Sequence, residues 1–461
     1  MNRIWQRPAT SRGARFFMVL VVTLAMGLPL YLISKTTEDR EEYRRVAAAE
    51  ITDTWGGPQT IVGPVLVVPV ADRSASTDPA SQRVWSRQVI LLPDSYNATA
   101  RIDAELRNKG IFTAPVYSAT IDVTADFATA IATARFADQE APLWEQTTLT
   151  IALTNTRGLR AHPVASWDGS ALALAAVASM GGLAGDTIGA TIGDPRGNGG
   201  KAVMKLVVAG SQRLAFIPVG RDSMIHATSN WRDPGFDGDF LPNSRTVGDA
   251  GFEATWSVPQ IARGFVQRIE PAQMRQLVSS TDAGVTLVQT VDLYRLMQRA
   301  MKYGLFFVGL ALLTVFVVEV TGQRAVHAAQ YVMIGLAKCV FFLLLLSLGE
   351  QIGFLAAYAT SSVATIALVC AYGRSALALG RRIWLMAAAL TGLYGVLFAL
   401  LQSPDLALLS GSLFAFAAIA ITMFATRHID WWASGSPPGA DRQAGGTHGP
   451  NGTLTPVSPQ A

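Results

Sequence analysis

The sequence predicts a membrane protein of the α+β class, with one N-terminal transmembrane signal anchor, a large and mainly antiparallel β domain, and a C-terminal five-helix transmembrane bundle. Three observations predict it. The 461 residues are 50% hydrophobic and only 15% charged. Apolar runs of about 20 residues, the length that crosses a bilayer, lie near both ends of the chain. Between them, short segments rich in β-branched and aromatic residues alternate with turn clusters, as in antiparallel β domains.

The N-terminus starts with a basic segment, residues 1–15, which we expect in the cytoplasm because positively charged flanks stay inside. Apolar residues 16–34 follow. A cleaved signal peptide is the alternative, but no small-x-small cleavage site follows Ser34, so we interpret 16–34 as an uncleaved transmembrane signal anchor. Residues 36–54 have helical spacing, and Trp55-Gly56-Gly57-Pro58 must end that helix.

Residues 35–302 are expected to form the β-rich domain outside the cytoplasm, with a helix at its start and another at its end. The stretch 116–127 alternates apolar and polar residues, which is typical of a half-buried strand. One large sandwich and two smaller lobes both fit this length. Residues 171–193 carry glycines at four-residue spacing but also Asp186 and few large apolar side chains, so we assign them to the β domain and not to the membrane.

The C-terminal part is expected to cross the membrane five times. A helix over 290–302 runs into the first span without a break, and Gly349-Glu350-Gln351 is expected to form a tight hairpin at the membrane surface. Residues 427–461, rich in Gly, Pro and Thr, are expected to form a disordered cytoplasmic tail. The five expected spans are about 303–320, 330–348, 352–372, 383–401 and 406–426.

The loop charges predict the orientation. With the N-terminus inside, the cytoplasmic loops carry the basic residues and the outer turns carry Glu350 and Asp405, which is the positive-inside asymmetry. A net charge of only +4, with arginines beside apolar spans, argues against a nucleic-acid partner and for the lipid bilayer. The cytoplasmic basic residues are Arg324, His327, Arg374, Arg381, Arg382, Arg427 and His428.

Several motifs, in this order along the chain, resemble the CreD family of bacterial inner-membrane proteins, described as cell-envelope integrity proteins. The resemblance runs from about Glu41 to Trp432. It implies a six-span envelope protein with a large periplasmic domain, and it implies no known reaction. Together with the cytoplasmic termini that the loop charges predict, it leads us to expect an inner-membrane protein that supports cell-envelope integrity and stress response. The motifs are Trp55–Thr60, Gly63–Pro69, Gly110–Tyr117, Ser229–Trp231 with Pro234 and Phe236, Phe240–Pro242, Lys302–Gly304, Ser347–Phe354 and Asp430-Trp431.

Two ionisable residues in the spans are candidate functional residues, because burying a charge in lipid costs about 3 kcal/mol. Glu319 lies near the cytoplasmic end of its span and Lys338 lies inside the next. We expect a Glu319–Lys338 pair that locks two helices, since a lysine side chain can stretch toward the surface. A relay or substrate path is the alternative.

Other candidates lie outside the spans. Glu350 in the expected hairpin sets topology, or docks the β domain onto an arginine near Arg295 or Arg299.

Aromatic side chains in loops are candidate contacts for a partner: Trp55 and, in the 230–242 loops, Trp231 and Phe236. Local turn packing is the alternative for each of them.

No catalytic or metal-binding motif is found. His162 and His226 are the only histidines between the spans and lack a second ligand at metal-site spacing, so we expect no cofactor and no metal. We therefore predict a non-enzymatic protein whose β domain binds or senses an envelope component or partner. The alternative is a membrane enzyme or transport component that acts on a lipid-linked or envelope substrate through the five-helix bundle.

Overall fold

The computed structural model divides the chain into two compact units. The helical unit comprises Met1–Asp39 and Leu293–Ala461, and the β unit comprises Arg40–Asp292. The N-terminal segment 1–11, the tail 428–461 and loop residues Arg324, Arg382 and Asp405, for which the sequence made predictions, lie outside the described residues. The structure describes residues 12–72, 86–138, 140–177, 185–197, 199–288, 293–320, 326–375, 381, 383–402 and 407–427.

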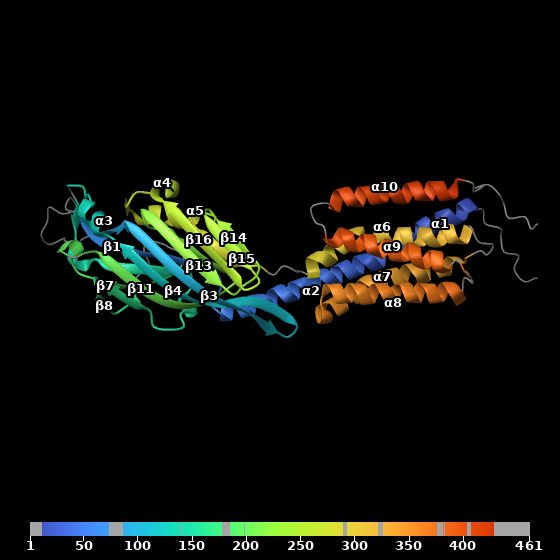
Figure 1. Cartoon of the computed structure of the whole chain (residues 1–461), viewed down its shortest axis with the longest axis horizontal. Coiled ribbons are helices and arrows are strands. Elements are labelled where there is room, and N and C mark those ends of the chain that lie inside the picture. The colour runs from blue at the N-terminus through green and yellow to red at the C-terminus, as the bar shows by residue number, and fades with distance from the viewer. Residues whose placement is uncertain are drawn as a thin grey trace, which may run out of the picture. The chain divides into compact units, whose positions relative to one another are not determined.

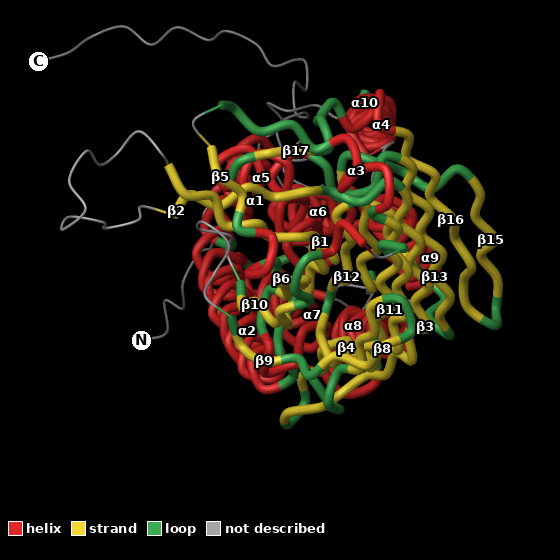
Figure 2. Tube along the Cα trace, turned by 90° about the vertical axis from the view of Figure 1, so that its left-hand side faces the viewer, coloured by secondary structure: helices red, strands yellow, loops and turns green. Residues whose placement is uncertain are grey.

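Two sheets build the β unit (Figures 1 and 2). Over the described residues, sheet A runs in the order β14-β18-β12-β1-β6-β10-β9, with β2, β5 and β17 attached beside β1 and β2, and sheet B runs β15-β16-β13-β3-β4-β11-β7-β8. The prediction of a mainly antiparallel domain is confirmed, with parallel pairs at β1–β12 and β3–β13. The strands are β1 Gln59–Asp72, β2 Ser86–Leu91, β3 Ser95–Lys109, β4 Phe112–Asp126, β5 Glu140–Pro142, β6 Thr148–Leu153, β7 Val164–Trp167, β8 Ser170–Leu172, β9 Ala175–Ala176, β10 Asp186–Thr191, β11 Lys201–Ser211, β12 Arg213–Ile217, β13 Asp222–Ser229, β14 Pro234–Gly238, β15 Ser244–Gly248, β16 Gly251–Pro259, β17 Arg268–Ile269 and β18 Ala283–Leu287.

The sheets differ in how much of their surface is covered. One apolar core contains side chains of both sheets, so they form two layers of one sandwich. In sheet A every residue of β1 from Ile61 to Val68 is buried, and Met274 and Leu277 of helix α5 (Pro271–Ser280) join the same core. In sheet B, β3 alternates buried and exposed side chains, which leaves one face of the sheet open. Short helices α3 (Ala128–Thr133) and α4 (Gln260–Arg263) complete the unit.

The N-terminal helices differ from the expected pair of separate segments. Helix α1 (Arg12–Ala25) turns at Met26 into α2 (Gly27–Thr54), which continues without a break to the start of the β unit. Gly56 and Gly57 then adopt positive φ angles of 92° and 71°, and Gly57 donates a backbone hydrogen bond to Thr52. These two glycines end the helix because other residues rarely adopt that backbone conformation.

Long apolar helices form the rest of the helical unit (Figure 1). Among the described residues, five helical segments are long and apolar enough to cross a membrane: α1 with α2, α6, α7, α8 and α9. The sixth expected span, 406–426, coincides with α10, and its crossing stays a prediction. The helices are α6 Leu293–Val320, α7 Ala328–Ile352, α8 Phe354–Ser375, α9 Ile383–Gln402 and α10 Ala407–Thr426.

The expected hairpin at Gly349-Glu350-Gln351 is wrong in its position. Helix α7 continues through these residues to Ile352, and only Gly353, with φ 79° and ψ 163°, separates it from α8. Glu and Gln are good helix formers, so the break moves to the glycine that can leave the helical conformation.

Candidate functional site

Glu319 is a buried carboxylate at the C-terminal end of α6. Its side chain is 1% exposed, and Arg15 of α1 lies 3.1 Å from its Oε1. The Tyr331 hydroxyl of α7 donates a hydrogen bond to its other oxygen, and the Val326 backbone N–H donates to Oε1 at 2.9 Å. The carboxylate thus ties together α1, α6, α7 and the segment before α7.

Lys338 lies in the core of the helical unit with no exposed surface. Its Nζ is 3.4 Å from the Tyr394 hydroxyl of α9 and 4.8 Å from the centre of the same ring. The Tyr394 ring also packs 4.8 Å from Phe341 and 4.9 Å from Phe307, measured between ring centres. The ammonium group is therefore held by an aromatic face and a hydroxyl inside a packed aromatic core.

The expected Glu319–Lys338 ion pair is replaced by two separate contacts, Glu319 with Arg15 and Lys338 with Tyr394. The physical reason is depth: Lys338 lies about ten residues into α7, roughly 15 Å along its axis, while Glu319 lies at the end of α6. Sequence reasoning used Arg15 only as a topology signal and missed it as the partner of Glu319.

Glu350 and the two arginines of the docking hypothesis all lie in the helical unit. Glu350 is half-buried in the last turn of α7 and accepts a 2.8 Å hydrogen bond from the Tyr294 hydroxyl of α6. Arg299 donates to the Leu400 carbonyl of α9 at 3.3 Å, and Arg295 is exposed on α6. Docking of the β unit onto these residues stays a prediction.

The aromatic candidates are held by neighbours in the β unit. Trp55 is half-buried, with the guanidinium groups of Arg160 and Arg107 at 4.7 Å and 5.1 Å from its ring. The Trp231 indole N–H lies 3.2 Å from two backbone carbonyl oxygens that it can donate to, those of Asp233 and Val288. These contacts give Trp55 and Trp231 packing roles.

Phe236 belongs to the sandwich core rather than to a free loop. It lies in β14 and packs edge to face on Phe252 and Trp256 of β16, with ring centres 5.6 Å and 5.9 Å apart. From the sequence alone, an aromatic residue near a Pro-Gly turn can be either packed in the core or exposed in a loop, and the local sequence does not distinguish the two.

The open face of sheet B is the feature that sequence reasoning missed. Asp122 lies 3.8 Å from both Arg101 and Lys205 across three neighbouring strands. Beside them, Asn230 donates hydrogen bonds to Asp103 and to the Ala104 carbonyl, both at 3.1 Å. The alternation of residues 95–105 could have indicated that one side of this strand is exposed. Which side chains of other strands share that face depends on the strand order, which the sequence does not show. The hollow on this face is lined by Arg101, Ile102, Asp103, Ser118, Thr120, Thr228, Ser229, Asn230 and Ala250.

Among the described residues, no group of three or more His, Cys, Asp or Glu side chains is placed to hold a metal ion. Cys339 and Cys370 are both free thiols within the helical unit.

These features define a multi-pass membrane protein in which a two-layer β unit is inserted between an N-terminal helix pair and a C-terminal group of apolar helices. The family model for the inner membrane protein CreD matches residues 11–432, and the chain belongs to this family. It is 31% identical over 419 residues to the inner membrane protein CreD of Escherichia coli (strain K12). The aligned region covers 90% of this chain and 92% of that protein. The chain is therefore a multi-pass protein of the inner membrane.

Proposed function

We propose that this inner-membrane protein supports cell-envelope integrity without catalysing a reaction, and that its β unit binds an envelope component in the periplasm. The observation that carries the proposal is the open face of sheet B. Arg101 and Thr99 of β3 point away from the core, whereas sheet A is buried along the whole middle of β1. An antiparallel sheet can pack one face on the core and leave the other exposed, and that exposed face is surface available for binding.

The chemistry of that face favours a polar, hydrogen-bonding ligand. Threonine, serine and asparagine side chains line the hollow together with Arg101 and Asp103. Hydroxyl and amide groups donate and accept hydrogen bonds, and they suit sugar hydroxyls or peptide backbone better than an apolar surface. Both are present in the polymers of a bacterial envelope.

The test is complementation of a deletion strain. Arg101→Glu together with Thr228→Trp places a reversed charge and a bulky ring on the open face, and we expect it to fail to restore resistance to envelope stress. Arg275→Glu on the exposed side of α5 is the matched charge control and should complement fully. Photo-crosslinkers at Thr99 and Thr120 should capture the envelope component from the wild type but not from the double variant.

Full complementation by the double variant, at normal protein abundance, would rule out the open face as the binding surface. If Arg275→Glu failed to complement as well, charge reversal anywhere on the β unit would impair folding. The loss of complementation by the double variant would then no longer support binding at the open face.

The alternative, a transport or enzyme component acting through the helices, draws support from Lys338. Its ammonium group and the hydroxyl of Ser361 are buried, and within the described residues that hydroxyl has no hydrogen-bond partner. Lys338→Leu separates the two functions: a path through the helices loses activity, whereas the envelope-binding function keeps it. The close packing of aromatic rings around Tyr394 favours the result in which Lys338→Leu keeps its function.

A further inference from the structure

We propose that helices α6, α9 and α10 hold one anionic phospholipid taken from the bilayer, with an acyl chain in an apolar groove and the phosphate beside the cations at the N-terminal end of α6. This proposal goes beyond the envelope function and does not depend on it. It requires only that the chain lies in the inner membrane.

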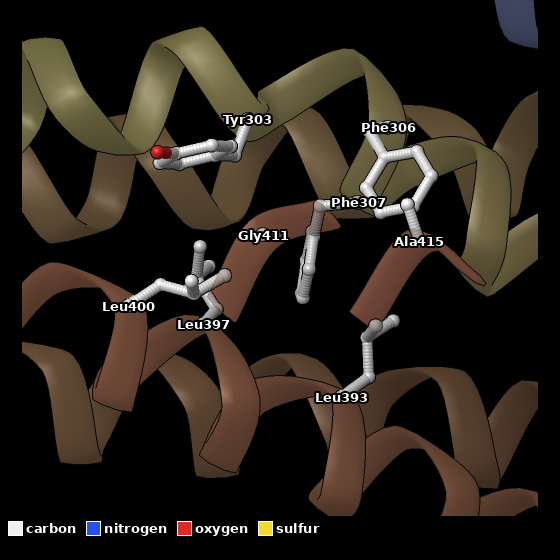
Figure 3. Close-up of a pocket in the computed structure, with 8 residues that line it drawn as sticks. All are labelled: Tyr303, Phe306, Phe307, Leu393, Leu397, Leu400, Gly411 and Ala415. Atoms are coloured by element: carbon white, nitrogen blue, oxygen red, sulfur yellow. The ribbon is translucent and has the colours of Figure 1, made fainter. Parts of the chain in front are cut away.

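The groove is a space of about 210 Å³ between the three helices. Figure 3 shows Tyr303 and Phe306 on one side and Leu393, Leu397 and Leu400 on the other. The walls are almost entirely carbon, and Leu393 to Leu400 extends for roughly 10 Å along α9, which is long enough to hold part of one acyl chain. The lining residues are Tyr303, Phe306, Phe307, Leu393, Leu397, Leu400, Gly411 and Ala415.

Small residues on α10 keep the groove open. A Cβ atom added at Gly411 would lie 3.8 Å from the Tyr303 ring, so any larger side chain there enters the space. Ala415 lies one turn further along α10 and faces the same groove. Larger residues at these two positions would close it.

Cations lie at one end of this groove. Arg295, Arg299 and Lys302 are spaced i, i+4 and i+7 on α6, so they share one helix face that continues into Tyr303. Arg299 donates to the carbonyl of Leu400, itself a groove residue, so its guanidinium lies at the mouth of the groove.

These cations match the chemistry of a lipid phosphate. A guanidinium has five N–H donors and binds phosphate oxygens in pairs, and an ammonium group adds a point charge. In the expected topology this end of α6 faces the outer leaflet, where positive residues are otherwise sparse. Such a cluster at the end of an apolar groove fits a lipid with a net negative headgroup better than a zwitterionic one.

The test measures lipid retention by the purified full-length chain. After delipidation in detergent, the protein is given phosphatidylglycerol or phosphatidylethanolamine with the same acyl chains, and bound lipid is counted by native mass spectrometry. We expect wild type to retain phosphatidylglycerol in preference. Lys302→Gln should weaken phosphatidylglycerol binding about fivefold, the effect of one basic residue near an anionic lipid, and leave phosphatidylethanolamine unchanged.

The groove is tested separately from the charge. Gly411→Leu or Ala415→Leu should reduce retention of both lipids, because the acyl-chain space is filled. Ala417→Leu adds the same bulk at an exposed position of α10, and Lys35→Gln removes an exposed cation of α2, so both should behave as wild type. Two groove variants are used so that the test still stands if one of them fails to fold.

Equal retention of the two lipids by wild type would mean annular lipid only and would overturn the proposal. Unchanged phosphatidylglycerol retention in Lys302→Gln, or unchanged retention in the correctly folded groove variants, would overturn it as well.

Discussion

Glu319 accepts hydrogen bonds from groups on three segments in a place where an isolated carboxylate would be costly. Arg15, Tyr331 and the Val326 backbone surround it. A buried charge is tolerated when it is paired and its oxygens are hydrogen-bonded, and removal of one partner leaves the rest unsatisfied. This one side chain therefore couples the N-terminal helix to the C-terminal helices.

A double-mutant cycle measures that coupling. Glu319→Gln keeps the volume but removes the charge, and we expect it to lower the free energy of unfolding by about 2 kcal/mol, the range of hydrogen bonds to a charged group. Arg15→Gln should cost less, because Arg15 is partly exposed. The double variant should recover about 1 kcal/mol of the summed loss. Strict additivity in detergent unfolding curves would show that the pair is not coupled.

Asp186 gives the β unit a small acid sensitivity. The Thr156 hydroxyl and backbone N–H donate hydrogen bonds to its carboxylate at 2.6 Å and 2.9 Å and lower the pKa of Asp186 below its ordinary value of 3.8. Because the folded-state pKa is depressed, this stabilisation is complete above pH 3.8 and is lost as the pH falls through the lower folded-state pKa. Since the carboxylate is exposed, the effect should stay below about 1 kcal/mol.

The check is the pH dependence of the unfolding midpoint between about pH 2 and pH 5. Relative to wild type, Asp186→Asn should be less stable at pH 5, and the difference should shrink toward pH 2. A difference that stays constant over this range would contradict the assignment.

At the scale of elements, glycines on α6 and α7 receive side chains of the N-terminal helices. A Cβ at Gly335 would lie 2.9 Å from the Met26 sulfur, and one at Gly309 would lie 3.0 Å from the Thr23 methyl group. Gly304 similarly faces Leu30. Small residues let helix backbones approach closely in lipid, where apolar burial alone gives no drive to associate.

Gly335→Leu tests this contact. Met26 is buried, so the bulk of a leucine should overpack this contact at a cost of about 1–3 kcal/mol. Gly335→Ala should be tolerated, because a single added methyl group needs only a small shift of the flexible methionine side chain. The control is Gly392→Leu on α9, where an added Cβ meets nothing within 4 Å. Equal unfolding midpoints for the two leucine variants would show that α1 and α2 do not pack tightly on α7.

Elements were more predictable than the contacts between them. Length and hydropathy place the apolar helices, and alternation places strands such as β4, because these signals are local. Partners distant in sequence are not local: β1 pairs with β12, and Arg15 meets Glu319 across 304 positions. The break between α7 and α8 was misplaced for the opposite reason, because polar residues suggested a turn where Tyr294 instead satisfies Glu350 within a helix.

For the whole molecule, orientation across the membrane decides what the β unit can meet. Arg374 lies in the last turn of α8, Arg381 precedes α9 and Arg427 follows α10. The positive-inside rule predicts that all three lie in the cytoplasm together with the N-terminus. With this orientation we expect the β unit in the periplasm, where the open face of sheet B would be accessible to envelope polymers. Residues 120 and 445 should therefore lie in opposite compartments.

Paired reporter fusions test this orientation. Alkaline phosphatase joined after residue 120 should be active, because the enzyme folds only outside the cytoplasm, and a green fluorescent protein joined at 445 should fluoresce, because it matures inside. The position of α10 is tested by the same pair: with six crossings the two ends of the chain share the cytoplasm, whereas five crossings would put residue 445 in the periplasm and extinguish its fluorescence. Loss of the signal at 445 with activity kept at 120 would remove α10 from the spans and leave the periplasmic site intact. Inactive phosphatase at 120 would place the open face of sheet B in the cytoplasm, where it could not reach the envelope polymers that the proposed function requires.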